Sequence, residues 1–271
     1  MNPIDVLFQT LKQQKRKAFL PFLPAGDPDL AFTAAVLPRL AASGASLIEV
    51  GFPFSDPIAD GPVIQESYTR ALRNKLKLDD LFATTRAVGE QPGWATPMVG
   101  MASYSLIHKR TPKAFIHRAL ASGLSGAVVP DLPAEEADTF AELCRGEGFK
   151  LILLVTPTTA PERMARIVAA CSGFVYVVSV VGITGGQAAT TGVVADVTAS
   201  LRSMTDLPLC VGFGVSTPAH VRELAPHCDG LIVGSAFVKL LGETTTQEDR
   251  TTAMDRIATL SQQLSAALPT G

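Results

Sequence analysis

The chain has 271 residues, of which 47% are hydrophobic and 18% charged, and its formal net charge is −2. This length and composition suit a chain with a large core, folded as one barrel-sized domain or as two smaller ones. The slight negative charge lacks the basic footprint of a nucleic-acid-binding protein and no apolar run approaches the length of a membrane span, so neither nucleic acid nor a membrane is an expected partner.

Strand-like and helix-like segments alternate along the chain. Ile4, Leu7, Phe8 and Leu11 recur at helical spacing, which predicts an amphipathic helix over residues 2–15 laid across one end of the domain. Apolar runs predict strands at 18–23, 46–50, 97–101, 126–129, 150–155, 174–178, 209–211 and 230–233. Helices are predicted at 28–43, with Asp27 as its cap, and at 63–73, 78–88, 112–121, 134–146, 161–170, 193–204, 218–224 and around 254–268.

The alternation of strands and helices favours a closed barrel over an open sheet. Eight strand and helix units of roughly thirty residues each, without a linker between them, match a parallel (β/α)8 TIM barrel of the α/β class with an extra N-terminal helix. We therefore expect one catalytic barrel domain over residues 1–271. The main competitor is a doubly wound sheet, whose glycine fingerprint would follow the first strand and is absent here.

The cysteines and histidines indicate neither disulfides nor a metal site. Cys144, Cys171, Cys210 and Cys228 lie far apart, form no CxxC pair and have apolar or helical surroundings, which predicts buried, reduced thiols and favours the cytoplasm. The four histidines show no ligand spacing with one another or with the cysteines, so no metal is expected. The N-terminal region carries the polar run KQQKRK in place of an apolar signal core.

The most informative stretch is residues 47–61, LIEVGFPFSDPIADG. Glu49 lies inside an apolar run, where a carboxylate must find a partner or be functional. Asp60 ends a proline-rich loop that cannot continue as strand. Catalytic groups of parallel barrels come from strand ends and the loops after them, so the two acids are candidates for acid and base roles. The competing interpretation is a Glu49 satisfied by backbone donors and an Asp60 that only shapes the turn before Gly61.

Glycine-rich turns follow the last two predicted strands. Gly212, Phe213 and Gly214 end the seventh, and Gly234 and Ser235 end the eighth, where such barrels commonly bind phosphate through backbone amides and helix N-termini. These glycines would also suit plain tight turns. The polar, glycine-rich loop at 180–192 predicts a mobile lid over the site, or otherwise an ordinary surface excursion.

Several segments, in order along nearly the whole chain, carry a specific resemblance. FLPFLPAGDPD, LIEVGFPFSDPIADGPVIQ, VVPDLPAEE, FVYVVSVVGITG, VGFGVSTP and VGSAFVK closely resemble the motifs of the tryptophan synthase alpha chain family. The resemblance implies a (β/α)8 barrel that cleaves indole-3-glycerol phosphate to indole and glyceraldehyde 3-phosphate in tryptophan biosynthesis. It also implies no cofactor in this chain and a beta chain partner that contains pyridoxal phosphate, in an α2β2 complex.

The resemblance also assigns site residues. It places the two catalytic acids on Glu49 and Asp60. The implied substrate-binding residues are those of the indole pocket, the strand-six tyrosine, the lid and the phosphate turns: Phe22, Met101, Val128, Leu154, Tyr176, Thr184, Gly185, Phe213, Gly214, Gly234 and Ser235. Among these, Thr184 is expected to meet Asp60 when the lid closes.

Two segments depart from the family pattern. Ser103, Tyr104 and Ser105 stand where the family usually has an aromatic residue, any residue and asparagine, in a loop near the interface with the beta chain. The lid reads GITGGQ where GVTGAR is common, which removes a cation, adds a glycine and predicts a more mobile lid.

The chemistry of a retro-aldol cleavage fits the two acids. A carboxyl group at the tip of an apolar strand should have a raised pKa and can relay protons, which suits Glu49. Asp60, on a loop expected to be more solvated, should stay ionised and accept a hydrogen bond from the indole NH. Two alternatives remain open at this stage: a non-catalytic activator subunit of the same complex, and another phosphate-binding barrel such as an isomerase of phosphosugar anilines.

Overall fold

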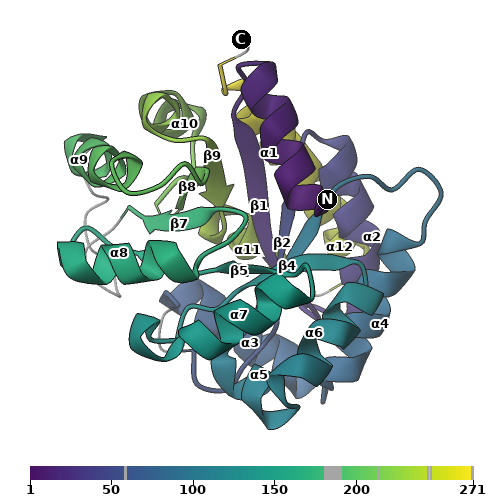
Figure 1. Ribbon diagram of the computed structural model, residues 1–271. Coiled ribbons are helices and arrows are strands. Elements are labelled where there is room, and N and C mark those ends of the chain that lie inside the picture. The colour runs from purple at the N-terminus through teal and green to yellow at the C-terminus, as the bar shows by residue number, and fades with distance from the viewer. Residues whose placement is uncertain (58–59, 180–190, 213, 243, 245, 270–271) are drawn as a thin grey trace.

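The computed structural model describes residues 1–57, 60–179, 191–212, 214–242, 244 and 246–269. Its strands form one parallel sheet in the order β5-β4-β3-β2-β1-β9-β8-β7-β6 (Figure 1). The strands are β1 Ala18–Pro24, β2 Ile48–Gly51, β3 Met98–Met101, β4 Leu124–Val128, β5 Lys150–Ile152, β6 Leu154–Val155, β7 Val175–Val178, β8 Leu209–Gly212 and β9 Gly230–Val233.

The sheet closes into a barrel through an interrupted strand. β5 pairs with β4 and β6 pairs with β7, and Leu153 alone separates β5 from β6. The Leu153 N–H donates to Cys171 Sγ at 3.3 Å, while its carbonyl accepts from the Tyr176 N–H at 3.2 Å. The strand predicted at 150–155 is therefore split, and the predicted eight-stranded barrel is confirmed with its fifth strand in two pieces.

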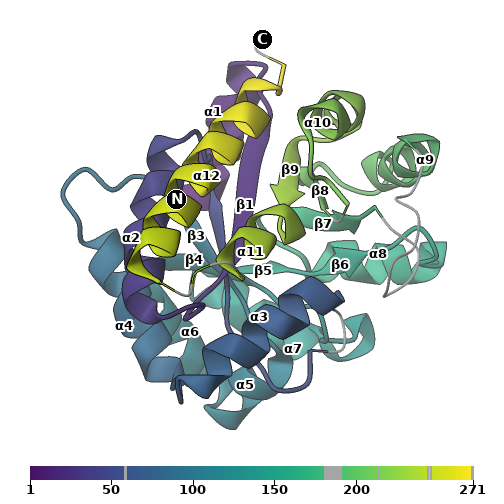
Figure 2. The ribbon, with the colours of Figure 1, turned by 180° about the vertical axis from the view of Figure 1, so that it is seen from behind.

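Helices surround the barrel on its outer side, as the two opposite views show (Figures 1 and 2). They are α1 Pro3–Gln13, α2 Leu30–Ala42, α3 Pro62–Arg73, α4 Leu78–Gly89, α5 Tyr104–Lys109, α6 Pro112–Ala121, α7 Asp138–Gly146, α8 Pro161–Ala170, α9 Thr191–Arg202, α10 Pro218–Leu224, α11 Ser235–Leu241 and α12 Gln247–Ala266, with 3-10 turns η1 Ala134–Glu136 and η2 Ala225–His227. In the described part of the chain, no helix has the length and apolar character needed to cross a membrane.

The N-terminal helix α1 covers the amino end of the barrel, as predicted. The Asn2 amide donates to the carbonyls of Ser125 and Gly148, at the starts of β4 and β5, at 2.8 and 2.9 Å. Asn2 also caps α1 by accepting from the Ile4 N–H at 2.9 Å. β1 and β9 run downward in Figure 1, so the carboxyl ends of the parallel strands open at the opposite, lower end of the barrel.

The core has two layers. Side chains inside the barrel, among them Leu20, Val99, Ile152 and Ile232, pack with α1 residues into one cluster. A larger cluster lies between the strands and the surrounding helices and includes Phe19, Phe115 and all of the cysteines except Cys210. All four cysteines are free and buried, as the sequence predicted. Strands buried on both faces explain the continuous apolar runs that made them recognisable in the sequence.

Three sequence-based expectations were wrong in detail. The helix predicted over 134–146 is split into η1 and α7. The short helix α5 was not predicted, because only Ile107 in it is buried and it shows no apolar stripe. The cap of α2 is Asp29, whose side chain accepts from the Phe32 N–H at 2.8 Å, and not Asp27.

Asp27 instead ties the loop after β1 to α3. It is only 2% exposed, accepts a hydrogen bond from Ser67 Oγ, and pairs with Arg70 Nη2 at 2.6 Å. Asn74 donates to the carbonyls of Gly26 and Pro28 at 3.1 and 2.6 Å. The buried Asp27 side chain thus has both a charged and a neutral hydrogen-bond donor. These bonds fix α3, the helix that directly follows Asp60.

Candidate active site

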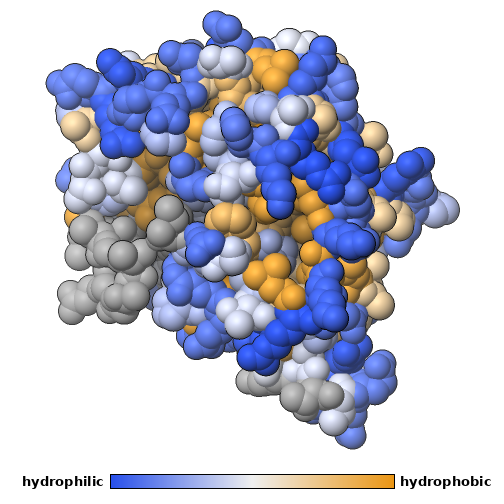
Figure 3. Space-filling model, turned by 90° about the horizontal axis from the view of Figure 1, so that it is seen from below, coloured by the Kyte–Doolittle hydropathy of each residue, from blue (hydrophilic) through white to orange (hydrophobic). Residues whose placement is uncertain are grey.

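A cavity of about 860 Å³ opens at the carboxyl ends of the strands. Figure 3 looks onto this end from below, and apolar surface gathers near its middle between hydrophilic side chains. Every predicted site residue within the described ranges lines this cavity: Phe22, Glu49, Asp60, Met101, Val128, Leu154, Tyr176, Gly214, Gly234 and Ser235. Three other predicted residues, Thr184, Gly185 and Phe213, lie outside the described residues, as do residues 180–190 of the lid predicted at 180–192. The last two residues of that predicted lid, Thr191 and Gly192, begin α9 instead.

Glu49 is held by β2 and points into the barrel. Its side chain is 2% exposed, and Oε1 has no hydrogen-bond partner among the described residues. Burial, followed by the negative charge of Asp60, raises the pKa of Glu49 from 4.5 to about 8. The predicted rise is confirmed, and Glu49 carries a proton at neutral pH.

Asp60 sits at the end of the proline-rich loop, directly before α3. Its backbone is held by Gln65, whose Nε2 donates to the Asp60 carbonyl at 2.7 Å. The expectation of a solvated Asp60 was wrong, because the residue is 7% exposed. Burial, and then the charge of Asp131, raises the pKa of Asp60 from 3.8 to about 7. Asp60 ionises before Glu49 as pH rises, but with a pKa of about 7 it is only partly ionised at neutral pH, so the expectation that it stays ionised holds only above that pH.

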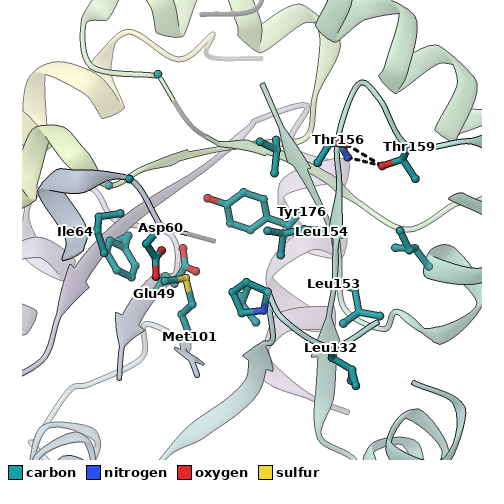
Figure 4. Close-up of a pocket in the computed structure, with 18 of the residues that line it drawn as sticks. Glu49, Asp60, Ile64, Met101, Leu132, Leu153, Leu154, Thr156, Thr159 and Tyr176 are labelled. Atoms are coloured by element: carbon teal, nitrogen blue, oxygen red, sulfur yellow. Dashed lines mark hydrogen bonds between the residues drawn. The ribbon is translucent and has the colours of Figure 1, made fainter. Parts of the chain in front are cut away.

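The two carboxyl groups face each other at one end of an apolar slot. Figure 4 shows Glu49 and Asp60 side by side with Met101 beneath them, and the Tyr176 hydroxyl directed toward them. Burial, and then the charges of Glu49 and Asp60, raises the pKa of Tyr176 well above its usual value, so its phenol stays protonated. Leu154 lies beside Tyr176, its pairing partner on the neighbouring strand.

The opposite wall of the cavity is built from backbone. Gly214 has a φ of +75°, a conformation that side-chain-bearing residues rarely adopt. Gly234 directly precedes α11 and has no side chain that could cap the first-turn N–H groups of this helix. A Cβ atom on Gly234 would lie 3.2 Å from the Phe22 ring, so this turn suits glycine. Uncapped amides beside glycines form a place where an anion can approach closely.

Sequence reasoning missed several residues of the site. Leu132, Thr156, Thr159 and Arg163 also line the cavity. Thr156 and Thr159 follow β6, so their position at a strand end was a usable signal. Gln65 carried no signal in the sequence, because its role as a donor to the Asp60 carbonyl depends on how the loop folds back onto α3.

The two carboxyl groups and the walls of the cavity together suit acid–base chemistry on an aromatic substrate with an anionic group. Between about pH 7 and pH 8, Glu49 holds a proton while Asp60 is ionised, so one group can donate a proton as the other accepts a hydrogen bond. The apolar slot suits a flat aromatic ring, and the glycine turns suit an anionic tail.

Comparison with known proteins identifies relatives along nearly the full length. Residues 8–269 match the family model described as tryptophan synthase alpha chain. The tryptophan synthase alpha chain of Rhodopirellula baltica is 44% identical over 264 residues, covering 97% of this chain and 95% of the relative. That of a Synechocystis species is 43% identical over 269 residues, covering 99% of this chain and 100% of the relative.

A solved structure supports the same grouping. The crystal structure of tryptophan synthase subunit alpha from Legionella pneumophila superposes with a TM-score of 0.86 at 31% sequence identity. The superposition covers 98% of each chain. This chain therefore shares the fold of that subunit along nearly its whole length.

Proposed function

The chain belongs to the tryptophan synthase alpha chain family, whose members cleave indole-3-glycerol phosphate, and we propose that Glu49 and Asp60 perform this cleavage here. The reaction is a carbon–carbon lyase step that yields indole and glyceraldehyde 3-phosphate. The observation that supports these roles is the buried pair of carboxyl groups with separated pKa values at the end of an apolar slot.

Glu49 relays protons in this mechanism. Its neutral carboxyl group donates a proton to indole carbon 3, which places positive charge on the ring nitrogen. The resulting carboxylate then takes the proton of the adjacent side-chain hydroxyl. The carbon–carbon bond breaks as that oxygen forms the aldehyde, and the bond electrons return to the indole ring. Glu49 ends protonated, so no other reactant is consumed.

Asp60 stabilises the charge that develops on the ring. Its ionised carboxylate accepts a hydrogen bond from the indole N–H, and this bond strengthens as the nitrogen becomes positive. Gln65 holds the Asp60 backbone in place through the 2.7 Å bond to its carbonyl. Holding an ionised group at a fixed position is the main way in which enzymes stabilise developing charge.

The remaining site residues bind the substrate. Phe22, Met101, Val128, Leu154 and Tyr176 enclose the indole ring. Gly214, Gly234 and Ser235 bind the phosphate through backbone amides, together with the predicted Gly185 and Phe213. Thr184 is assigned to the lid that meets Asp60. The support for this division is that the apolar and glycine-rich walls lie in one cavity.

The product indole is passed to a partner. We assign the partner as a tryptophan synthase beta chain containing pyridoxal phosphate, with an α2β2 assembly in the cytoplasm, while this chain needs no cofactor of its own. The loop before Asp60 and the start of α5 are neighbours, since Phe54, Asp56, Pro57 and Ser103, the N-cap of α5, line one small cavity. A partner docked on this loop and on α5 would act directly on the position of Asp60.

Steady-state assays of the isolated chain test the catalytic roles. Glu49→Gln preserves size but removes the proton, so indole formation should fall by about a hundredfold or more while substrate binding persists. Asp60→Asn should give a comparable loss. Glu142→Gln, an exposed change on α7, is the matched control and should keep full turnover. Retention of more than about a tenth of wild-type turnover by Glu49→Gln would exclude the relay role.

A further inference from the structure

A second phenol lies behind the catalytic acids. Tyr68 projects from α3, is 3% exposed, and packs with the side chains inside the barrel. A Cβ atom on Gly51 would lie 2.8 Å from the Tyr68 hydroxyl, so this hydroxyl rests on the end of β2, two residues beyond Glu49. Tyr68 does not line the large cavity and therefore does not touch the substrate.

Two tyrosines thus flank the acids in matching ways. The Tyr176 hydroxyl rests against Gly212 at the end of β8, as the Tyr68 hydroxyl rests against Gly51 at the end of β2. Tyr176 faces the substrate cavity, whereas Tyr68 faces a separate cavity of about 30 Å³. Asp60 lines both cavities, together with Met101 and Pro130.

The small cavity is polar enough and large enough for one water molecule. A buried water needs roughly 10–15 Å³ and several polar partners. Asp60, Tyr68, Asp131 and Ser103 all line this space. Asp131 already accepts from Ser103 Oγ at 2.6 Å and from the Tyr104 N–H at 2.8 Å, so its position is fixed.

Negative charges dominate the surroundings of Tyr68. Burial, and then the charges of Asp60 and Glu49, raises the pKa of Tyr68 well above its usual value, which keeps the phenol a donor. Asp56 and Asp131 approach the same cavity from the loops after β2 and β4. Beside β1, the Asp27 carboxylate is engaged by Arg70 and Ser67. On α11 the cation Lys239 is exposed.

We propose that Tyr68 is a positioning residue that donates a hydrogen bond to Asp60 through a water molecule in the small cavity and so keeps Asp60 ionised during catalysis. This proposal rests on the proposed role of Asp60. A donor directed at the charged form of a carboxyl group favours that form. Asp60 is surrounded by other acids, whose charges disfavour its ionised form. A hydrogen-bond donor on the side of Asp60 that faces away from the substrate offsets this repulsion. It also leaves the other side of the carboxylate free to accept from the indole N–H.

The test is the pH dependence of kcat for indole formation in Tyr68→Phe, which removes only the hydroxyl. Asp60 then protonates more readily, so the acid limb of the profile should move up by about one pH unit and kcat at pH 7 should fall about fivefold. Tyr104→Phe removes the same group from α5, where the ring packs against Phe140, and should leave the profile unchanged. An acid limb in Tyr68→Phe that coincides with that of the wild type would overturn the proposal.

A second variant covers the case in which Tyr68→Phe folds poorly. Site-specific replacement of Tyr68 with a fluorotyrosine keeps the ring and makes the hydroxyl a stronger donor, so the acid limb should move to lower pH. A shift to higher pH, or none, would overturn the proposal. Glu49→Gln and Asp60→Asn, assayed alongside, separate the two hypotheses, because their inactivity upholds the catalytic roles whatever happens at Tyr68.

Discussion

Replacing Glu49 with glutamine should stabilise the fold at alkaline pH while it abolishes turnover. In the native state Glu49 keeps its proton up to about pH 8, whereas in the unfolded chain it loses that proton near pH 4.5. The native state therefore binds the extra proton between these values. Stability from this group is fully present below pH 4.5 and is lost as pH rises to about 8.

The magnitude follows from the size of this rise. Each pKa unit corresponds to about 1.4 kcal/mol, so the wild type loses about 4 kcal/mol of unfolding free energy between pH 5 and pH 9 through Glu49. Glutamine has no proton to lose and fills the same space, so the variant escapes this loss. For a chain of this size, the variant should melt about 8 °C above the wild type at pH 9 and within about 2 °C of it at pH 5.

Thermal unfolding of wild type and Glu49→Gln at pH 5, 7 and 9 measures the effect directly. Glu142→Gln makes the same side-chain replacement at an exposed position of α7 and should track the wild type at every pH. If the melting curves of Glu49→Gln and Glu142→Gln show the same pH dependence, the carboxyl group of Glu49 is ionised in the native state and the assignment of its proton is wrong.

Three further outcomes are expected. The pH profile of kcat should be bell-shaped, because kcat falls when Asp60 is protonated below about pH 7 and when Glu49 is ionised above about pH 8. A flat profile from pH 6 to 9 would contradict this assignment. Gly234→Val should raise the KM for the phosphorylated substrate far more than for a dephosphorylated analogue, and equal effects would argue against an anion site. Ser105→Asn places a longer side chain, which can both donate and accept hydrogen bonds, at an exposed position of α5. One added hydrogen bond of about 1 kcal/mol should increase the activation of indole formation by a cognate beta chain severalfold. Equal activation of the variant and the wild type would show that the serine is neutral.

The barrel and its acidic pair could be predicted from the sequence because their signals are local. Strands buried on both faces appear as apolar runs, and the helices α6, α8 and α10 begin at proline and occupy the predicted residues. Glu49 was recognisable because a carboxylate in an apolar run is costly without a function or a partner. Motif order along the chain then identified the family, which the comparisons confirm.

The tertiary structure decided what depends on contacts between distant segments. Asp60 follows a polar, proline-rich sequence, yet the packing of its loop against α3 buries it and raises its pKa. Asp27 and Asp29 are both plausible caps of α2, and only the position of Arg70 on α3 shows that Asp27 is a buried partner instead. Tyr68 appears in the sequence as one more residue on an amphipathic helix. Burial and charge are set by which groups meet across the fold, and that information is not contained in any single segment.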